Sequence, residues 1–287
     1  MKPIKYLLES IIIFFLFFIF KFLGLKYSSY LSGKIGSFFG PIFRSKKLVT
    51  SNISQALPNL DSEKKVKIIK NMWNNYGRIL GEFIFMKKFR NSVPNKYIEI
   101  EGKEILEEIK NGNEPVIFVS GHFNNFELMA MQIEKAGVNV AAIYRPLNNI
   151  FINKFMERIR KKYICQNQVK KGITSIRRLL QFFKSGSSIA LMIDQRVSEG
   201  IKVNFFDKEA YTTTIPAQFV KKFNCRVVPI YIERLKDNTS FKIKIHKPLN
   251  FEKEDSIKKI TYQLNLWLEK AILKNPDQWI WTHNRWK

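Results

Sequence analysis

Residues 115–137 read PVIFVSGHFNNFELMAMQIEKAG. The unbroken apolar run at the start, PVIFVS, is typical of a strand that is buried on both faces of a sheet. Gly121 allows a sharp turn after it, and residues 127–136 have the composition of a helix that Gly137 ends. A buried strand, a polar turn and a helix in this order form the repeating unit of α/β folds. The turn carries His122, whose role is the central question of the sequence.

The chain beyond Pro94 repeats this pattern. Apolar runs predict further strands at 97–101, 138–144, 188–194, 226–234 and 241–248. Amphipathic segments predict helices at 103–111, 151–162, 174–184, 216–223 and 256–273. Such alternation predicts an α/β fold in which helices flank a mainly parallel central sheet.

The N-terminal segment is predicted to be a membrane anchor. Residues 7–25 are apolar except for Glu9, Ser10, Lys21 and Gly24, and a spanning helix needs about 20 apolar residues. No small-residue cleavage site follows, so an uncleaved helix that spans the membrane or lies in its interface is favoured over a secretory signal. We therefore expect three parts: an anchor helix at 1–27, a membrane-proximal helical segment at 28–93 and an α/β domain at 94–287.

The charge balance predicts an anionic partner. The chain carries 49 Lys and Arg against 24 Asp and Glu, a net charge of +25. Such a surplus favours a membrane surface, a phosphorylated substrate or nucleic acid, although a genome rich in lysine codons explains scattered lysines equally well. No nucleic-acid-binding motif occurs, so nucleic acid is not expected. The two cysteines, sixty residues apart, have no metal-ligand spacing, and we expect neither a metal nor a cofactor.

Polar residues follow three of the predicted strands. His122 follows 115–120, Arg145 follows 138–144, and Asp194, Gln195 and Arg196 end or follow 188–194. In α/β folds the chemistry lies beyond the carboxyl ends of the strands. These side chains are therefore the candidate site.

His122 has a carboxylate, Glu127, five residues further on. Within one helix the two side chains would point about 140° apart, but a histidine on the turn can fold back onto a carboxylate in the first helical turn. Such a carboxylate fixes the tautomer of a general base. A histidine that simply caps the helix is the commoner outcome. His246 and His283 have no carboxylate at a useful spacing, and the pattern differs from the zinc motif H-E-x-x-H.

The chain offers a base without a matching protein nucleophile. It contains no G-x-S-x-G elbow, no Walker loop and no G-x-G-x-x-G. A hydroxyl of the substrate is then the expected nucleophile. The segment 152–184 carries ten basic residues against one acidic residue, Glu157, which favours a docking surface for a polyanion over an ordinary solvated helix face.

An ordered series of motifs resembles the bacterial lipid A biosynthesis acyltransferases of the late lauroyl/myristoyl type, within the H-x4-[DE] glycerolipid acyltransferase superfamily. The motifs are GHFNNFE, YRPLNN, the strand end IDQR, NFFDKEAYTTTIPAQFVKKFNCRVVPIY and PDQWIWTHNRW, and the resemblance covers nearly the whole chain. It implies transfer of a fatty acyl chain from an acyl-carrier-protein thioester, or acyl-CoA, to a hydroxyl of a phosphorylated lipid A precursor. It also implies a bacterial inner (cytoplasmic) membrane enzyme with its catalytic domain on the cytoplasmic side.

The resemblance also implies residue roles. His122 would deprotonate the acceptor hydroxyl and Glu127 would orient the imidazole, while Arg145 would bind phosphate or developing charge. The remaining substrate-binding candidates are Asn125, Asp194, Gln195, Arg196, Thr213 and Thr214. Pro229 falls where the superfamily has a structural proline.

Three other functions stay open from the sequence. The acceptor could be another glycolipid or a phospholipid, because the phosphate block of the superfamily appears here only as IDQRVSEG. A non-catalytic, membrane-anchored protein that binds anionic lipid would use the positive charge without needing His122. A hydrolase would replace the hydroxyl acceptor with water.

Overall fold

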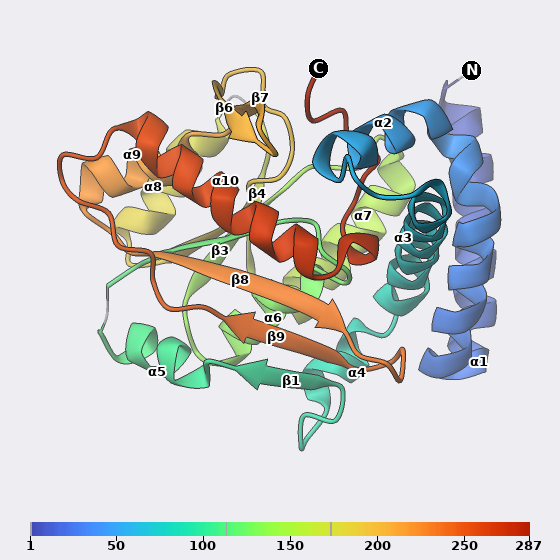
Figure 1. Ribbon diagram of the computed structural model, residues 1–287. Helices are drawn as coiled ribbons and strands as arrows, with labels where there is room; N and C mark the ends of the chain where they lie inside the picture. The colour runs from blue at the N-terminus through green and yellow to red at the C-terminus, as the bar shows by residue number, and fades with distance from the viewer. Residues whose placement is uncertain (1, 113, 173) are drawn as a thin grey trace.

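A seven-stranded sheet with helices packed around it forms the body of the protein in the computed structural model, which describes residues 2–112, 114–172 and 174–287 (Figure 1). The strands of this sheet are β1 (Ile98–Glu101), β2 (Ile117–Ser120), β3 (Val140–Tyr144), β4 (Asn167–Lys170), β5 (Ser188–Met192), β8 (Val227–Arg234) and β9 (Phe241–Ile245). A separate hairpin pairs β6 (Ile201–Phe205) with β7 (Lys208–Thr212). The helices are α1 (Lys2–Phe43), α2 (Lys46–Ala56), α3 (Ser62–Phe83), α4 (Met86–Asn91), α5 (Lys103–Gly112), α6 (Glu127–Lys135), α7 (Ile150–Ile159), α8 (Ser175–Lys184), α9 (Ile215–Phe223) and α10 (Ile257–Lys274), with a π-helix at Arg160–Ile164 and a 3-10 turn at Pro276–Gln278.

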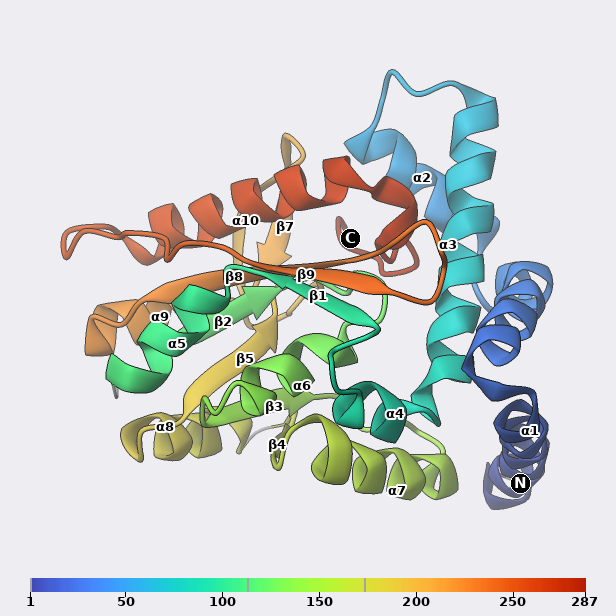
Figure 2. The ribbon, with the colours of Figure 1, turned by 90° about the horizontal axis from the view of Figure 1, so that it is seen from below.

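The predicted α/β class with a mainly parallel sheet is confirmed. The strand order is β1-β9-β8-β2-β5-β3-β4, and every neighbouring pair is parallel except β8 and β9. The exception arises because β8 and β9 are joined by a tight turn, and a short connection can join only antiparallel strands. The carboxyl ends of β2, β5 and β8 consequently meet at one edge of the sheet, the edge that faces α3 (Figures 1 and 2).

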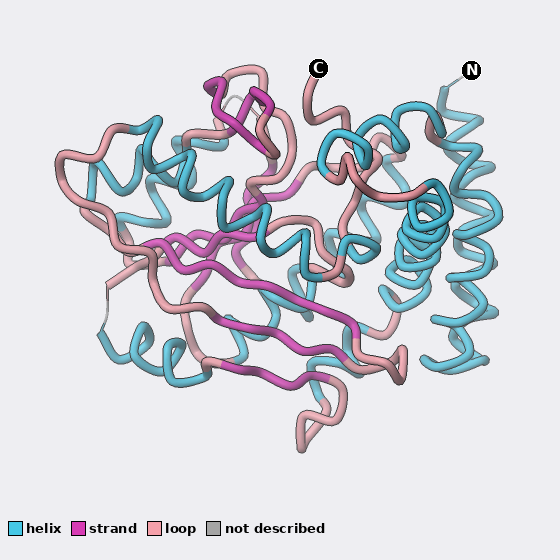
Figure 3. The backbone as a smooth tube through the Cα atoms, in the orientation of Figure 1, coloured by secondary structure: helices cyan, strands magenta, loops and turns pink. Residues whose placement is uncertain are grey.

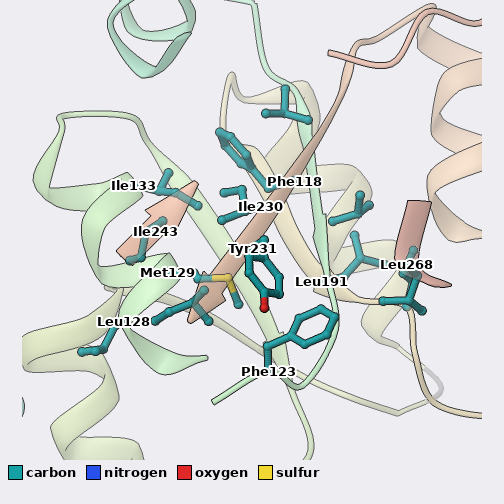
Figure 4. Close-up of a cluster of buried hydrophobic side chains, with 14 of the residues drawn as sticks. Phe118, Phe123, Leu128, Met129, Ile133, Leu191, Ile230, Tyr231, Ile243 and Leu268 are labelled. Atoms are coloured by element: carbon teal, nitrogen blue, oxygen red, sulfur yellow. The ribbon is translucent and has the colours of Figure 1, made fainter. Parts of the chain in front are cut away.

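Helices cover both faces of the sheet, as the view from below shows (Figure 2). Helix α10 lies across one face, whereas α6, α7 and α8 lie on the other. Phe118 of β2 and Ile230 of β8 belong to one buried apolar cluster with Met129 of α6 and Leu268 of α10 (Figure 4). Full burial of one large apolar side chain is worth about 1.5–3 kcal/mol, so this cluster supplies much of the stability. In Figure 3 the strands of the large sheet lie at the centre with helices around them, β1 forms the lower edge of the sheet, and the β6–β7 hairpin projects at the top.

Helix α1 is bent, and its second half packs tightly against α3. The bend lies at Gly24, which has φ 73°. Beyond it, glycines on both helices bring the backbones together: a Cβ on Gly77 would come within 2.1 Å of the carbonyl oxygen of Ser32. Only a residue without a side chain fits such a crossing, as in the small-residue contacts of membrane helices. The glycines at 36, 40, 77 and 81 therefore fix how α1 sits on the protein.

The first half of α1 packs on α7. The Asn149 side chain accepts a hydrogen bond from Ser10 Oγ at 3.0 Å and donates to the Tyr6 carbonyl at 2.8 Å. The rings of Phe14 and Phe155 meet edge to face with centroids 5.4 Å apart. Most of the remaining apolar side chains of this half are exposed, and α1 is long and apolar enough to cross a membrane, with a mean hydropathy of 2.3 in its most apolar window.

The sequence analysis did not predict β4, the β6–β7 hairpin or the π-helix that extends α7. The hairpin turn consists of Phe206 and Asp207, with φ of 51° and 57°. Two left-handed residues define a type I′ turn, which usually carries Asn-Gly, so this turn has no recognisable sequence signal. The hairpin packs against α10, where Asn265 donates a hydrogen bond to the Asn204 carbonyl at 2.8 Å.

Candidate active site

His122 and Asp194 lie side by side at the carboxyl edge of the sheet. They follow the neighbouring parallel strands β2 and β5, whose register pairs Ser120 with Met192. Each residue therefore stands two positions beyond a paired residue, and the two loops leave the sheet together. Asp194 Oδ1 lies 2.8 Å from His122 Nδ1, and Asp194 Oδ2 accepts the backbone N–H of His122 at 2.7 Å. The carboxylate thus holds both the backbone and the ring of His122.

Gly121 makes this close approach possible. A Cβ at this position would lie 3.3 Å from Asp194 Oδ2 and 2.9 Å from side-chain carbons of Phe123 and Leu268. A larger residue would therefore crowd Asp194 and the ends of these two side chains, which would have to shift. The glycine that the sequence indicated as a turn residue also suits the close packing at the site.

The electrostatics of the pair favour the ionic form of both members. Burial disfavours a charged imidazole, but the charge of Asp194 and its hydrogen bond outweigh burial and raise the pKa of His122 above its usual value. Burial would raise the pKa of Asp194, but the His122 charge, the bonds from His122 and the Trp279 indole lower it. Asp194 therefore stays ionised, and His122 Nε2 is the atom left to exchange a proton.

The C-terminal segment completes this side of the site. Trp279 Nε1 donates to Asp194 Oδ2 at 2.9 Å, and Trp279 is 3% exposed. The neighbouring Gln278 accepts hydrogen bonds from the backbone and side chain of Asn124, a residue with φ 41° in the His122 loop. The segment therefore fixes both the carboxylate and the loop that carries the histidine.

Among the described residues, no hydrogen bond joins Glu127 to His122, which differs from the expectation that Glu127 orients the imidazole. Its Oε1 accepts hydrogen bonds from Arg160 Nε at 2.9 Å and Nη2 at 2.5 Å. Glu127 is the first residue of α6, and from there its side chain reaches the π-helix after α7 rather than turning back. Its charge still acts on His122 and favours protonation of the ring. Asp194, which the sequence analysis placed among the lining residues, occupies the orienting position instead.

Asn125 lies in the His122 loop and is 0% exposed. It was expected to bind substrate, but a fully buried side chain cannot reach one. Its Nδ2 donates to Glu82 Oε2 at 2.9 Å. Glu82 also forms a buried, two-pronged ion pair with Arg234 at the end of β8, and it accepts a hydrogen bond from Ser29 of α1 at 2.6 Å. The cluster connects α1, α3, the sheet and the His122 loop.

The other predicted site residues fall in different environments. Arg145 is exposed at the end of β3, and Gln195 and Arg196 are partly exposed beside Asp194. Thr213 and Thr214 are buried, and their hydroxyls accept hydrogen bonds from Ile215 N and Gln218 within the first turns of α9. Within the described residues, no hydrogen bond joins either threonine to His122 or Asp194.

Three residues at the site went unpredicted: Arg160, Trp279 and His283. Arg160 belongs to a run of basic residues that looked like a charged surface, yet its guanidinium is buried against Glu127 and lies 5.3 Å from the centre of the Tyr144 ring. The aromatic tail that holds Trp279 and His283 carried no spacing that indicated contact with β5. No group of metal-ligating side chains occurs in the described parts of the chain.

The arrangement is suited to proton transfer with a nucleophile supplied by the substrate. An ionised carboxylate on Nδ1 leaves Nε2 of the neutral ring free to accept a proton. The His122 side chain is 20% exposed and Asp194 is 0% exposed, so a substrate can reach the imidazole and not the carboxylate.

Comparison of the whole chain with known proteins identifies similar proteins. The model of the bacterial lipid A biosynthesis acyltransferase family matches residues 1–287. The chain is 23% identical over 262 residues to the lipid A biosynthesis palmitoleoyltransferase of Escherichia coli (strain K12), covering 90% of this chain and 84% of that protein. It is 22% identical over 264 residues to the lipid A biosynthesis myristoyltransferase of the same organism, covering 89% and 80%. The 1-acyl-sn-glycerophosphate acyltransferase structure from Thermotoga maritima aligns with a TM-score of 0.38 and 16% identity over 89% of this chain and 96% of that one.

Proposed function

Because the chain belongs to the bacterial lipid A biosynthesis acyltransferase family, we propose that it transfers a fatty acyl chain from a thioester to a hydroxyl of a phosphorylated lipid A precursor, forming an acyloxyacyl ester. The observation that carries the mechanism is the His122–Asp194 pair, in which a buried carboxylate lies 2.8 Å from Nδ1 of a partly exposed imidazole. Acyl transfer to an alcohol requires a base of this kind, since a hydroxyl is a weak nucleophile until its proton is removed.

In the proposed reaction, His122 Nε2 takes the proton of the acceptor hydroxyl while the hydroxyl oxygen attacks the thioester carbonyl carbon. The carbonyl π electrons move to oxygen and form a tetrahedral intermediate. When they return, the C–S bond breaks, and the thiolate leaves with the proton from His122. Asp194 stabilises the imidazolium between these steps by its charge and its hydrogen bond, and stays ionised throughout.

The charge of the protein supports an anionic acceptor and an anionic donor. Arg145, Lys171 and Arg196 surround the carboxyl edge of the sheet, and the first two are exposed. Their positions suit the phosphates of a glycolipid, with Arg145 as the leading candidate. The exposed basic side chains of α7 and α8 suit an acyl carrier protein, a class of acidic proteins, as the thioester donor. Acyl-CoA is the alternative thioester donor.

The proposed location is the bacterial inner membrane, with the catalytic domain on the cytoplasmic side. Support comes from the exposed apolar surface of α1, whose first half packs beside α7 and the Arg145 loop. An anchor held in this way supports an acceptor lipid that reaches the protein from the membrane. The fixed contacts with α7 favour a helix that lies in the membrane interface over one that crosses the bilayer independently.

Mass spectrometry tests the proposal. Membranes containing the protein are incubated with a tetra-acylated, phosphorylated lipid A precursor and acyl-carrier-protein thioesters, and parallel reactions contain acyl-CoA. We expect one added acyl mass with the wild type and none with His122→Ala, while His246→Ala serves as a control and behaves as the wild type. No added mass with any donor would contradict the assigned acceptor, and a fully active His122→Ala protein would contradict the base.

A further inference from the structure

A second histidine, His283, reaches the site from the C-terminal segment. The tripeptide 194–196 contacts one histidine at each end: Asp194 binds the His122 ring, and the backbone N–H of Arg196 donates to His283 Nε2 at 2.9 Å. The same segment supplies Trp279, which binds Asp194 from the other side. Asp194 and His122 are both close enough to His283 for their charges to act on its ionisation.

The hydrogen bond from Arg196 fixes the tautomer of His283. A backbone N–H can only donate, so Nε2 must accept and the proton of the neutral ring must be on Nδ1. In a protonated ring, the Nε2–H group would point at the backbone N–H of Arg196, and no hydrogen bond could form between them. Burial, together with the charges of Arg285 and His122, outweighs the nearby carboxylate and lowers the pKa of His283 to about 4. His283 is therefore a neutral hydrogen-bond donor at any pH where His122 can act as a base.

The donor atom of this ring is available to a ligand. Among the described residues, no hydrogen bond is formed by His283 Nδ1, and the ring is partly exposed. The residue cannot move freely, because its carbonyl accepts hydrogen bonds from Asn52 of α2 at 2.7 Å and from the backbone N–H of Arg285 at 2.9 Å. A donor held in place on the same tripeptide as the general base needs no reorganisation when charge develops on an oxygen within its reach.

We propose that His283 is a catalytic residue that donates its Nδ1 proton in a hydrogen bond to an anionic substrate oxygen beside His122. This inference rests on the proposed acyl transfer and adds a role that His122 and Asp194 cannot fill. The oxygen is either the oxyanion of the tetrahedral intermediate or a phosphate oxygen of the acceptor. His283 cannot itself act as a base, because Nε2 is occupied and Nδ1 already carries a proton.

The test is steady-state kinetics of acyl transfer with His283→Phe, which keeps a flat aromatic ring and removes both ring nitrogens. Loss of an oxyanion donor lowers kcat about 10²–10³-fold with little change in KM, whereas loss of a phosphate contact raises the KM for the acceptor and leaves kcat intact. Either result supports the inference. His283→Gln retains an acceptor for the Arg196 N–H and a donor group, so it should recover part of the activity.

The matched control is His246→Phe. The His246 ring packs against Trp267 with ring centroids 5.7 Å apart, remote from the site. Thermal unfolding of each variant separates loss of the donor from loss of the fold, and the Gln variant keeps the test open if the Phe variant does not fold. A folded His283 variant with wild-type kcat and KM would overturn the inference alone. A wild type without transfer activity would remove the proposed function and the inference with it.

Discussion

The Asp194→Asn substitution is the sharpest perturbation of the site, because it changes one group and leaves the volume unchanged. In the wild type the carboxylate accepts three hydrogen bonds, from His122 N at 2.7 Å, His122 Nδ1 at 2.8 Å and Trp279 Nε1 at 2.9 Å. An asparagine keeps a single oxygen. That oxygen remains with the two fixed donors, the backbone N–H and the indole, because neither of them can become an acceptor.

The amide NH₂ then faces His122 Nδ1, which must accept, and the ring proton moves to Nε2. A ring protonated on Nε2 cannot take the proton of the acceptor hydroxyl. The same exchange in a Ser-His-Asp triad lowers kcat about 10⁴-fold, equivalent to about 5 kcal/mol in the barrier. We expect a loss of about 10³–10⁴-fold in kcat, with KM for both substrates nearly unchanged because Asp194 does not face the substrate.

Radiolabelled acyl transfer under saturating substrate measures this loss. The matched control is Asp237→Asn in the β8–β9 turn, where the carboxylate also accepts hydrogen bonds from Thr239 N, Ser240 N and Ser240 Oγ but contacts neither His122 nor Asp194. The control should keep wild-type kcat. Glu127→Gln should lose less than Asp194→Asn, since Glu127 binds Arg160. Nearly full activity in Asp194→Asn, or a larger loss in Glu127→Gln, would refute the assigned roles.

Three further outcomes follow from the same geometry. Because His122 acts as a base only when neutral and its pKa is raised, kcat/KM should fall as the pH drops through a midpoint above 6.5, and a pH-rate profile with a lower midpoint contradicts this. Glu82→Ala leaves the buried Arg234 without its partner and should lower the free energy of unfolding by about 3–5 kcal/mol. Glu108→Ala removes the partner of Arg226 in an exposed pair and should lower it by less than about 1 kcal/mol. Denaturant titration in micelles compares the two variants. Gly121→Ala should lower kcat without loss of fold, because its Cβ would lie 3.3 Å from Asp194 Oδ2 and crowd the pair; unchanged turnover would show that the site tolerates the added methyl group.

The fold was largely accessible from the sequence, because its strands and helices are long, periodic and bounded by turn residues. The run PVIFVS and the alternating FKIKI both form strands close to the predicted positions. The β6–β7 hairpin was missed because its strands are half polar and its turn uses Phe206 in a conformation that the residue type does not indicate. The bend in α1 likewise depends on packing against two different helices.

The site was predicted in part. His122 could be found because it follows a buried strand and a glycine, and these are local features. Asp194 was expected at the site as a lining residue, but its hydrogen bond to the ring could not be predicted, because Asp194 lies 72 residues away and is brought close only by the pairing of β2 with β5. Glu127, the nearest carboxylate in the sequence, was the natural candidate for the partner of His122, yet it forms its hydrogen bonds with Arg160. Contacts of the C-terminal segment depend on tertiary structure in the same way, so Trp279 and His283 gave no signal.

The most direct test of the central claim, that Asp194 orients His122 as the base, is ¹⁵N NMR of the protein labelled only at histidine. The chain has three histidines, so each ring can be assigned by substitution of the other two. At a pH above the raised pKa of His122, we expect its proton on Nδ1 and an unprotonated Nε2 in the wild type and in Glu127→Gln. The proton should move to Nε2 in Asp194→Asn. A wild-type ring with its proton on Nε2, or a tautomer that follows Glu127 instead of Asp194, would contradict the account.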